Sequence, residues 1–201
     1  MIIRTCLCAL LVSMATLHAN ATTRDDIVGT RTEATWRVQS FVFRHSSSVA
    51  YSCRALHDKI AAILQAVGAA DGAIVALDCR GGMLRTARAH ITLASPVEAT
   101  ASSVEMPRWL TARAELVARL RNAPAPSAAA IKPFPATWRR VSLGGHGHTR
   151  LDPSDCELVR EMVKQVFPRL ATHVRGRPMC SNGVTRGMPR EVVALVRDGS
   201  A

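Results

Sequence analysis

Most sequence signatures of enzymes and membrane proteins are missing from this chain of 201 residues. It has no Gly-x-Ser-x-Gly elbow, no phosphate-binding glycine-rich loop before a helix and no His-Glu-x-x-His motif. Their absence excludes the hydrolase, nucleotide-binding and metalloprotease classes that such motifs define. After residue 21, no apolar run is long enough to form a transmembrane helix. Aromatic residues are also scarce, at 4% of the chain, so each structural unit has few large side chains to bury.

The first residues have the layout of a signal peptide. Arg4 is the only charge before an apolar stretch over residues 6–17, and Ala19 and Ala21 supply the small residues of a cleavage site. The apolar stretch is too short to remain as a membrane-spanning helix. We therefore expect cleavage after Ala21 and export of the remaining chain to the periplasm or the medium.

Acidic residues are few relative to basic ones. Without residues 1–21, the chain has 25 basic and 15 acidic residues and a net charge of +10, with arginine far more frequent than lysine. Such a charge attracts nucleic acid, anionic lipid or acidic glycans. The arginines are scattered, however, and no run of five like charges exists, which argues against a dedicated nucleic-acid-binding arm.

Four cysteines follow the predicted cleavage site: Cys53, Cys79, Cys156 and Cys180. An even number in an exported chain indicates disulfides, and four cysteines allow three connectivities. No two of them have the spacing of a zinc ribbon or of a redox Cys-x-x-Cys, so neither zinc binding nor redox chemistry is expected of them.

The chain contains an internal repeat. "YSCRALHDKIAAIL" at 51–64 is matched by "SDCELVREMVKQVF" at 154–167, and "ATWR" occurs at both 34–37 and 136–139. Aligning the helix cysteines superimposes apolar residues that lie on one helical face. These pairs are Leu56 with Val159, Ile60 with Val163, Ile63 with Val166, Leu64 with Phe167 and Val67 with Leu170.

The first copy reads as β-α-β-β. We predict a strand over 35–44, a turn at "HSSS", and a helix over 53–67 with Ser52 as its N-cap. Strands follow over 73–79 and 84–94, and in the second of these apolar residues alternate with Arg88, His90 and Thr92.

The second copy has the same order of elements. We predict strands over 138–143, 172–175 and 191–196, with a helix that starts at "LDPSD" and runs to about residue 166. In both copies the cysteines lie at the start of the helix and the end of the second strand. This placement predicts the pairs Cys53–Cys79 and Cys156–Cys180, each worth about 3 kcal/mol.

The predicted fold is therefore α+β, a duplication of a disulfide-stapled β-α-β-β unit with mostly antiparallel sheets. Residues 22–106 form the first repeat and 136–201 the second. Between them, 107–122 have the spacing of an amphipathic helix, followed by a Pro/Ala linker to 135. Two duplicated lobes often pack about a pseudo-two-fold axis, and we expect a partner in the cleft between them.

The cysteine-centred pattern, with "YSC" in the first copy and "DCELV" in the second, resembles a group of small exported bacterial proteins. The resemblance covers most of the chain after residue 21. It implies export and the duplicated architecture, but no activity.

"HITL" at 90–93 is similar to the His-x-Thr/Ser motif of two-histidine phosphoesterases, which are also duplicated α+β proteins. In such enzymes two histidines act as general acid and base on a cyclic phosphate. His90 and Thr92 are thus candidates for catalysis. The second copy has no histidine in the matching region, and "HTRL" at 148–151 precedes the helix, so the expected symmetry fails. A solvent-facing histidine on a strand is the alternative interpretation.

"GGHGH" at 144–148 is a candidate metal site, in which His146 and His148 would need Asp152 or His173 to complete the ligand set. Spacing fixes no third ligand, and a glycine-rich turn that happens to contain histidines is the favoured interpretation. We expect no metal and no cofactor.

Taken together, these features predict an exported, non-enzymatic binding protein of the envelope or secretome. Its partner would be a protein or an anionic envelope component, with Arg88, His90 and Thr92 as the candidate binding face. A phosphodiesterase-like hydrolase that uses His90 and Thr92 is the alternative.

Overall fold

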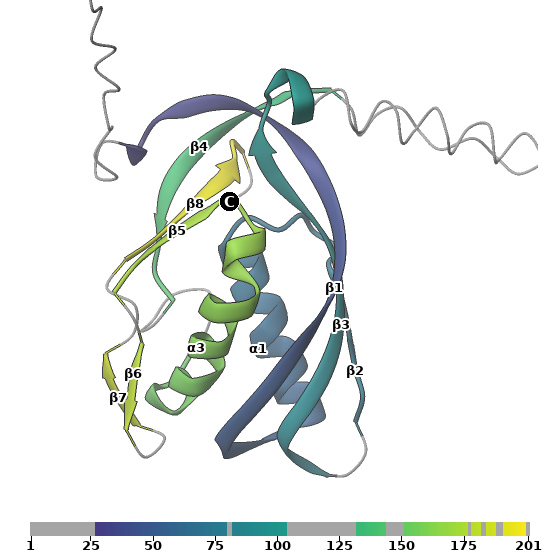
Figure 1. The fold of residues 1–201 in the computed structure, drawn as a ribbon, viewed down its shortest axis with the longest axis vertical. Helices are drawn as coiled ribbons and strands as arrows, with labels where there is room; N and C mark the ends of the chain where they lie inside the picture. The colour runs from purple at the N-terminus through teal and green to yellow at the C-terminus, as the bar shows by residue number, and fades with distance from the viewer. Residues whose placement is uncertain are drawn as a thin grey trace, which may run out of the picture.

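The computed structural model describes residues 27–79, 82–103, 132–143, 151–176, 178–181, 184–187 and 191–199. The first half contains these elements: β1 Arg31–Ser52, α1 Cys53–Ala66, β2 Ile74–Leu77 and β3 Met83–Glu98 (Figure 1). The second half contains the following: β4 Phe134–Val141, η3 Pro153–Asp155, α3 Cys156–Gln165, η4 Phe167–Arg169, β5 Thr172–Arg175, β6 Met179–Ser181, β7 Val184–Gly187 and β8 Glu191–Arg197.

The described strands of both halves form one antiparallel sheet of six strands in the order β2-β3-β1-β4-β8-β5, and β6 and β7 form a separate hairpin. Each half contributes the same arrangement, because β3 lies between β1 and β2 just as β8 lies between β4 and β5. The predicted duplicated α+β fold is confirmed. The β6-β7 hairpin lies between β5 and β8 in the chain and has no counterpart among the described residues between β2 and β3.

The two halves meet where β1 pairs with β4. The pairs Thr32–Ala136 and Ala34–Phe134 flank a central pair, Glu33–Pro135. The "ATWR" alignment matches Ala34 with Ala136, and therefore Thr32 with Phe134, so each flanking pair is the symmetric image of the other. The sequence repeat thus corresponds to a pseudo-two-fold axis through the middle of the sheet.

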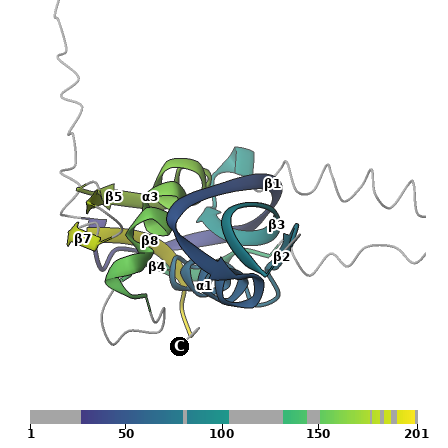
Figure 2. The ribbon, with the colours of Figure 1, turned by 90° about the horizontal axis from the view of Figure 1, so that it is seen from below.

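The sheet bends into an arch, and α1 and α3 lie inside it (Figure 1). Seen from below, the two edge strands β2 and β5 lie at opposite sides of the molecule (Figure 2). The repeated apolar face of the helices fills the interior, where Leu56, Ile60 and Val159 are fully buried in one cluster with residues of both sheet halves. The interior between the halves is therefore a shared hydrophobic core, in the place where the sequence suggested a cleft for a partner.

Both predicted disulfides are confirmed. Cys53, at the start of α1, is bonded to Cys79, just after β2, and Cys156, at the start of α3, is bonded to Cys180 in β6. The predicted N-cap is also present, because the Ala55 amide donates to the Ser52 hydroxyl at 3.2 Å. No helix among the described residues has the length and apolar character needed to cross a membrane.

The predicted turn at "HSSS" is wrong. β1 continues as a strand to Ser52, and the only interruption is a shift in its register with β3 between Ser46 and Tyr51. Serines and a histidine suggest a turn locally, but His45 and Ser46 stay paired with β3, and Ser47 and Ser48 lie in a bulge that the Glu157 side chain of α3 holds. The predicted helix over 107–122 and the segment 1–26, which includes the predicted signal peptide, lie outside the described residues.

Gly68 gives a test of the contact between the halves. It follows α1 with φ +91°, and a Cβ built there would lie 2.5 Å from the Leu195 carbonyl oxygen in β8. Gly72 is a matched control, because it has φ +90° but a Cβ there would meet nothing within 4 Å. We expect Gly72→Ala to lower the free energy of unfolding by about 1–2 kcal/mol, the cost of a left-handed backbone with a Cβ. Gly68→Ala should lower the free energy of unfolding by about 1–3 kcal/mol more than Gly72→Ala does, because the added Cβ clashes with the Leu195 carbonyl. Equal losses in urea denaturation would contradict this packing.

Candidate functional site: an arginine-bearing sheet face

The functional candidates depend on how β1 is held. Past Ala34, β1 has β3 on one side and no described strand on the other. Side chains of α3 bind part of this free edge instead. The Arg44 amide donates to Oε1 of Gln165 at 3.0 Å, and Nε2 of Gln165 donates to the Arg44 carbonyl at 2.8 Å. Gln165 thus pairs with the backbone of Arg44 as a neighbouring strand would.

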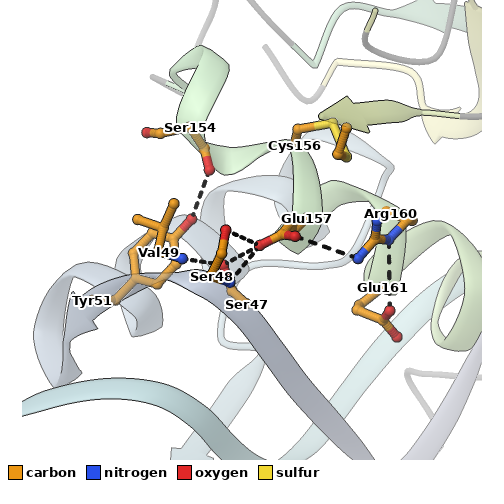
Figure 3. Close-up of polar contacts among 10 residues, drawn as sticks. Ser47, Ser48, Val49, Tyr51, Ser154, Cys156, Glu157, Arg160 and Glu161 are labelled. Atoms are coloured by element: carbon orange, nitrogen blue, oxygen red, sulfur yellow. Dashed lines mark hydrogen bonds and ion pairs between the residues drawn. A yellow bond between two sulfur atoms is a disulfide. The ribbon is translucent and has the colours of Figure 1, made fainter. Parts of the chain in front are cut away.

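The β1 bulge is held by Glu157 in the first turn of α3 (Figure 3). One carboxylate oxygen accepts hydrogen bonds from the Ser48 amide at 2.6 Å, the Ser48 hydroxyl at 2.9 Å and the Ser47 hydroxyl at 2.8 Å. The bond from the Ser48 amide and those from the two hydroxyls hold the pKa of Glu157 below its usual value, although burial acts in the opposite direction. The charged form of Glu157 therefore stabilises the bulge.

A second tie between the halves lies deeper. Asp155 is fully buried, and its carboxylate accepts from the Tyr51 hydroxyl at 2.9 Å and from the Asp152 amide at 2.7 Å. Lys59 of α1 forms an ion pair with the same carboxylate. Burial, together with the adjacent Asp155 carboxylate, raises the pKa of Tyr51, so the phenol stays protonated and acts as a donor.

His45 lies on the inner face of β1, only 3% exposed, with its ring 5.5 Å from that of Tyr51. Neither ring nitrogen has a hydrogen-bond partner among the described residues. Burial lowers the pKa of His45, against the carboxylates of Glu161, Glu157 and Asp155, which raise it. His45 is therefore a neutral core residue at pH 7.

The opposite face of β1, β2 and β3 points to solvent. Its exposure follows from the alternation along the strands, because Phe43 and Ile91 are buried whereas Val42 and His90 are exposed. The strand register places the outward residues in four cross-strand rows. In order along β1 these rows are Val38 and Ala94; Ser40, Thr92 and Ile74; Val42, His90 and Ala76; and Arg44 and Arg88. We call these residues the outer face.

The end row of the outer face carries two like charges. Arg44 and Arg88 are direct register partners, and both are exposed. Neither guanidinium has a hydrogen bond or ion pair with any part of the chain that the structure describes. Like charges directly opposite each other destabilise a sheet. The carboxylate of Asp78, which lines the same pocket, offsets part of this repulsion.

A pocket of about 400 Å³ adjoins this pair. Thr86, Asp78, Leu84, Ala87 and His45 line it together with the two arginines. Because the His45 ring lies on the inner face against Tyr51, its nitrogens do not belong to the polar groups at the pocket. Among the polar residues that line the pocket, two arginines and one threonine can donate hydrogen bonds to an anion, and one aspartate opposes it.

The predicted catalytic candidates lie on the same face. His90 is exposed, and its register partners Val42 and Ala76 offer neither an acid nor a base. The Thr92 hydroxyl is 2.8 Å from that of Ser40 across the strands, so it already has a partner. The arrangement brings the predicted Arg88, His90 and Thr92 onto one face and adds Arg44, which sequence reasoning missed. Alternation along β1 could have placed Arg44 outward, but only the strand register pairs it with Arg88.

The proposed metal ligands are not brought together by the described structure. His146 and His148 lie outside the described residues. The ring centroids of His173 and Trp138 are 4.9 Å apart, and a carboxylate oxygen of Asp152 lies 3.4 Å from Nζ of Lys59. Among the residues that the structure does describe, no group of three or more histidine, cysteine or acidic side chains could hold a metal ion.

Comparisons with protein-family models, with curated protein sequences and with solved structures find no match for this chain.

The Glu157 contacts predict a pH-dependent stability. A carboxyl group whose folded pKa is lowered stabilises the protein above its unfolded pKa of about 4.3 and loses this effect as the pH falls through the folded value. Glu157→Gln should therefore lower the free energy of unfolding by about 1–3 kcal/mol at pH 7 and by much less near pH 3. Urea denaturation at both pH values measures this, with the exposed Glu33→Gln as control. A loss of equal size at both pH values would contradict the assigned role.

Proposed function

We propose that this chain is an exported, non-enzymatic binding protein that holds an anionic component of the cell envelope on its outer face. The observation that carries the proposal is the direct opposition of Arg44 and Arg88, neither of which forms an ion pair within the described residues, beside a solvent-facing pocket. Natural proteins retain a destabilising arrangement of this kind where it serves binding. An anion between the guanidinium groups would remove their repulsion and gain two charge-assisted interactions.

Two further features support this proposal. The net charge of +10 after residue 21 favours encounter with anionic surfaces over a distance of about one Debye length. The two disulfides are consistent with a location outside the reducing cytosol. A binding protein needs only an exposed patch, whereas a hydrolase needs convergent titratable groups, and the register partners of His90 supply none.

Binding to immobilised heparin, as a generic polyanion, tests the charge requirement. The oxidised wild-type chain should bind and should elute with increasing salt. The double variant Arg44→Gln/Arg88→Gln should elute at clearly lower salt, with at least tenfold weaker affinity. Arg54→Gln/Arg139→Gln is the matched control, because it removes the same charge from α1 and β4, away from the outer face. Equal weakening of both double variants would show that only net charge matters and would contradict a specific site.

The hydrolase alternative has its own test. The wild-type chain and His90→Ala should both be inactive on a panel of 2′,3′-cyclic nucleotides and phosphodiesters. An activity that His90→Ala abolishes, while the thermal unfolding midpoint stays unchanged, would replace the binding proposal with catalysis.

A further inference from the structure

The outer face is amphipathic along the strands. The arginine pair and its pocket lie at one end, and exposed apolar side chains continue from there. Val38 is 70% exposed, Val42 41% and Ile74 62%. From Arg44 to Val38 the strand extends by about 20 Å, at roughly 3.3 Å per residue. Beyond the arginine pair, exposed apolar side chains share the face with the polar side chains of His90, Ser40 and Thr92. A cationic end with exposed apolar side chains beyond it matches a ligand that is itself anionic at one end and apolar beyond it.

The polar end is suited to phosphate. Guanidinium groups form paired, charge-assisted hydrogen bonds with phosphate oxygens, and the Thr86 hydroxyl adds a neutral donor at the same pocket. The Asp78 carboxylate at the pocket opposes the binding of any anion. Because Asp78 offsets part of the positive charge, a bound phosphate depends on both arginines acting together.

The exposed apolar side chains indicate which kind of anionic envelope component fits the outer face. A sulfated or carboxylated glycan gains little from Val38, Val42 and Ile74, because these side chains form no hydrogen bonds. The interface of a phospholipid bilayer offers phosphate groups at one depth and apolar chains just below it, so it satisfies both ends of the face.

We propose that the outer face docks on an anionic phospholipid surface, with a lipid phosphate at Arg44, Arg88 and Thr86 and with Val38, Val42 and Ile74 against the apolar region. This inference rests on the proposed function and specifies its ligand. It also gives the apolar side chains of Val38 and Val42 a role in binding. In a glycan-binding protein, these side chains would have no such role.

Co-sedimentation with vesicles tests the inference. The oxidised full chain should bind phosphatidylcholine vesicles that contain phosphatidylglycerol and should not bind vesicles of phosphatidylcholine alone. Each arginine removed should weaken binding about fivefold, so Arg44→Gln/Arg88→Gln should lose about 25-fold. Val38→Ser/Val42→Ser should weaken vesicle binding at least fivefold and leave heparin binding unchanged. Arg54→Gln/Arg139→Gln serves again as the charge-matched control.

Asp78→Asn provides a variant that must gain function. Removal of the opposing carboxylate should tighten vesicle binding severalfold, with no sedimentation of the variant in the absence of vesicles. Titration with inorganic phosphate, followed by NMR, separates a lipid phosphate from the free ion.

Several outcomes would overturn the inference. Binding to heparin or inorganic phosphate without binding to the anionic vesicles would leave the proposed function standing but would exclude phospholipid as the ligand. Vesicle binding that Val38→Ser/Val42→Ser does not weaken would also exclude it, because charge alone would then suffice. Failure of the wild-type chain to bind any of the three anionic probes would refute both proposals.

Discussion

The pairing of α3 side chains with the free edge of β1 is the interaction on which the rest of the structure depends. β1 is paired with β4 only over Arg31–Ala34, and beyond this point the two strands separate. A long strand edge with unsatisfied backbone groups is costly and prone to aggregation. Gln165 satisfies the amide and the carbonyl of Arg44, and Glu157 satisfies the amide of Ser48. β1 and β4 can therefore diverge without leaving this part of the β1 edge unpaired.

The same contacts couple the interior of the molecule to its surface. Gln165 holds the backbone of Arg44 from the free edge, and the register with β3 on the other side places Arg44 opposite Arg88. The buried Asp155, with its partners Tyr51 and Lys59, holds the start of α3 against β1 and α1. Removing one partner of a buried charge typically costs about 3–5 kcal/mol. The second half of the chain thus acts as the support for a surface carried by the first.

Much of this architecture could be predicted because the same sequence pattern occurs in both copies of the repeat. The helix cysteines, the apolar stripe of Leu56 and Ile60, and the alternation around His90 are local patterns that define elements and their buried sides. The disulfide pairing followed from the order of elements alone. The bulge at Ser47 and Ser48 could not be predicted, because its cause is Glu157, more than a hundred residues away. A local preference of serine for turns was overridden by a tertiary contact.

In the candidate site, too, local patterns could be predicted and contacts between distant segments could not. The alternation of β3 placed Arg88, His90 and Thr92 on one face from sequence alone. The opposition of Arg44 and Arg88 depends on the register between β1 and β3, which a bulge and a long strand both affect, so no local signal could fix it. The shared core between the halves also required the junction at Glu33 and Pro135, a pairing that neither repeat specifies by itself.

The most direct test of this account is an NMR titration that follows the arginine side-chain Nε–Hε signals while a short-chain phosphatidylglycerol is added. Arg44→Lys and Arg88→Lys variants assign the two resonances. The account predicts that the signals of Arg44 and Arg88 shift together, at lower lipid concentration than those of the other arginines. Uniform shifts across all arginines, or a first response elsewhere on the molecule, would contradict the assignment of the outer face as the binding site.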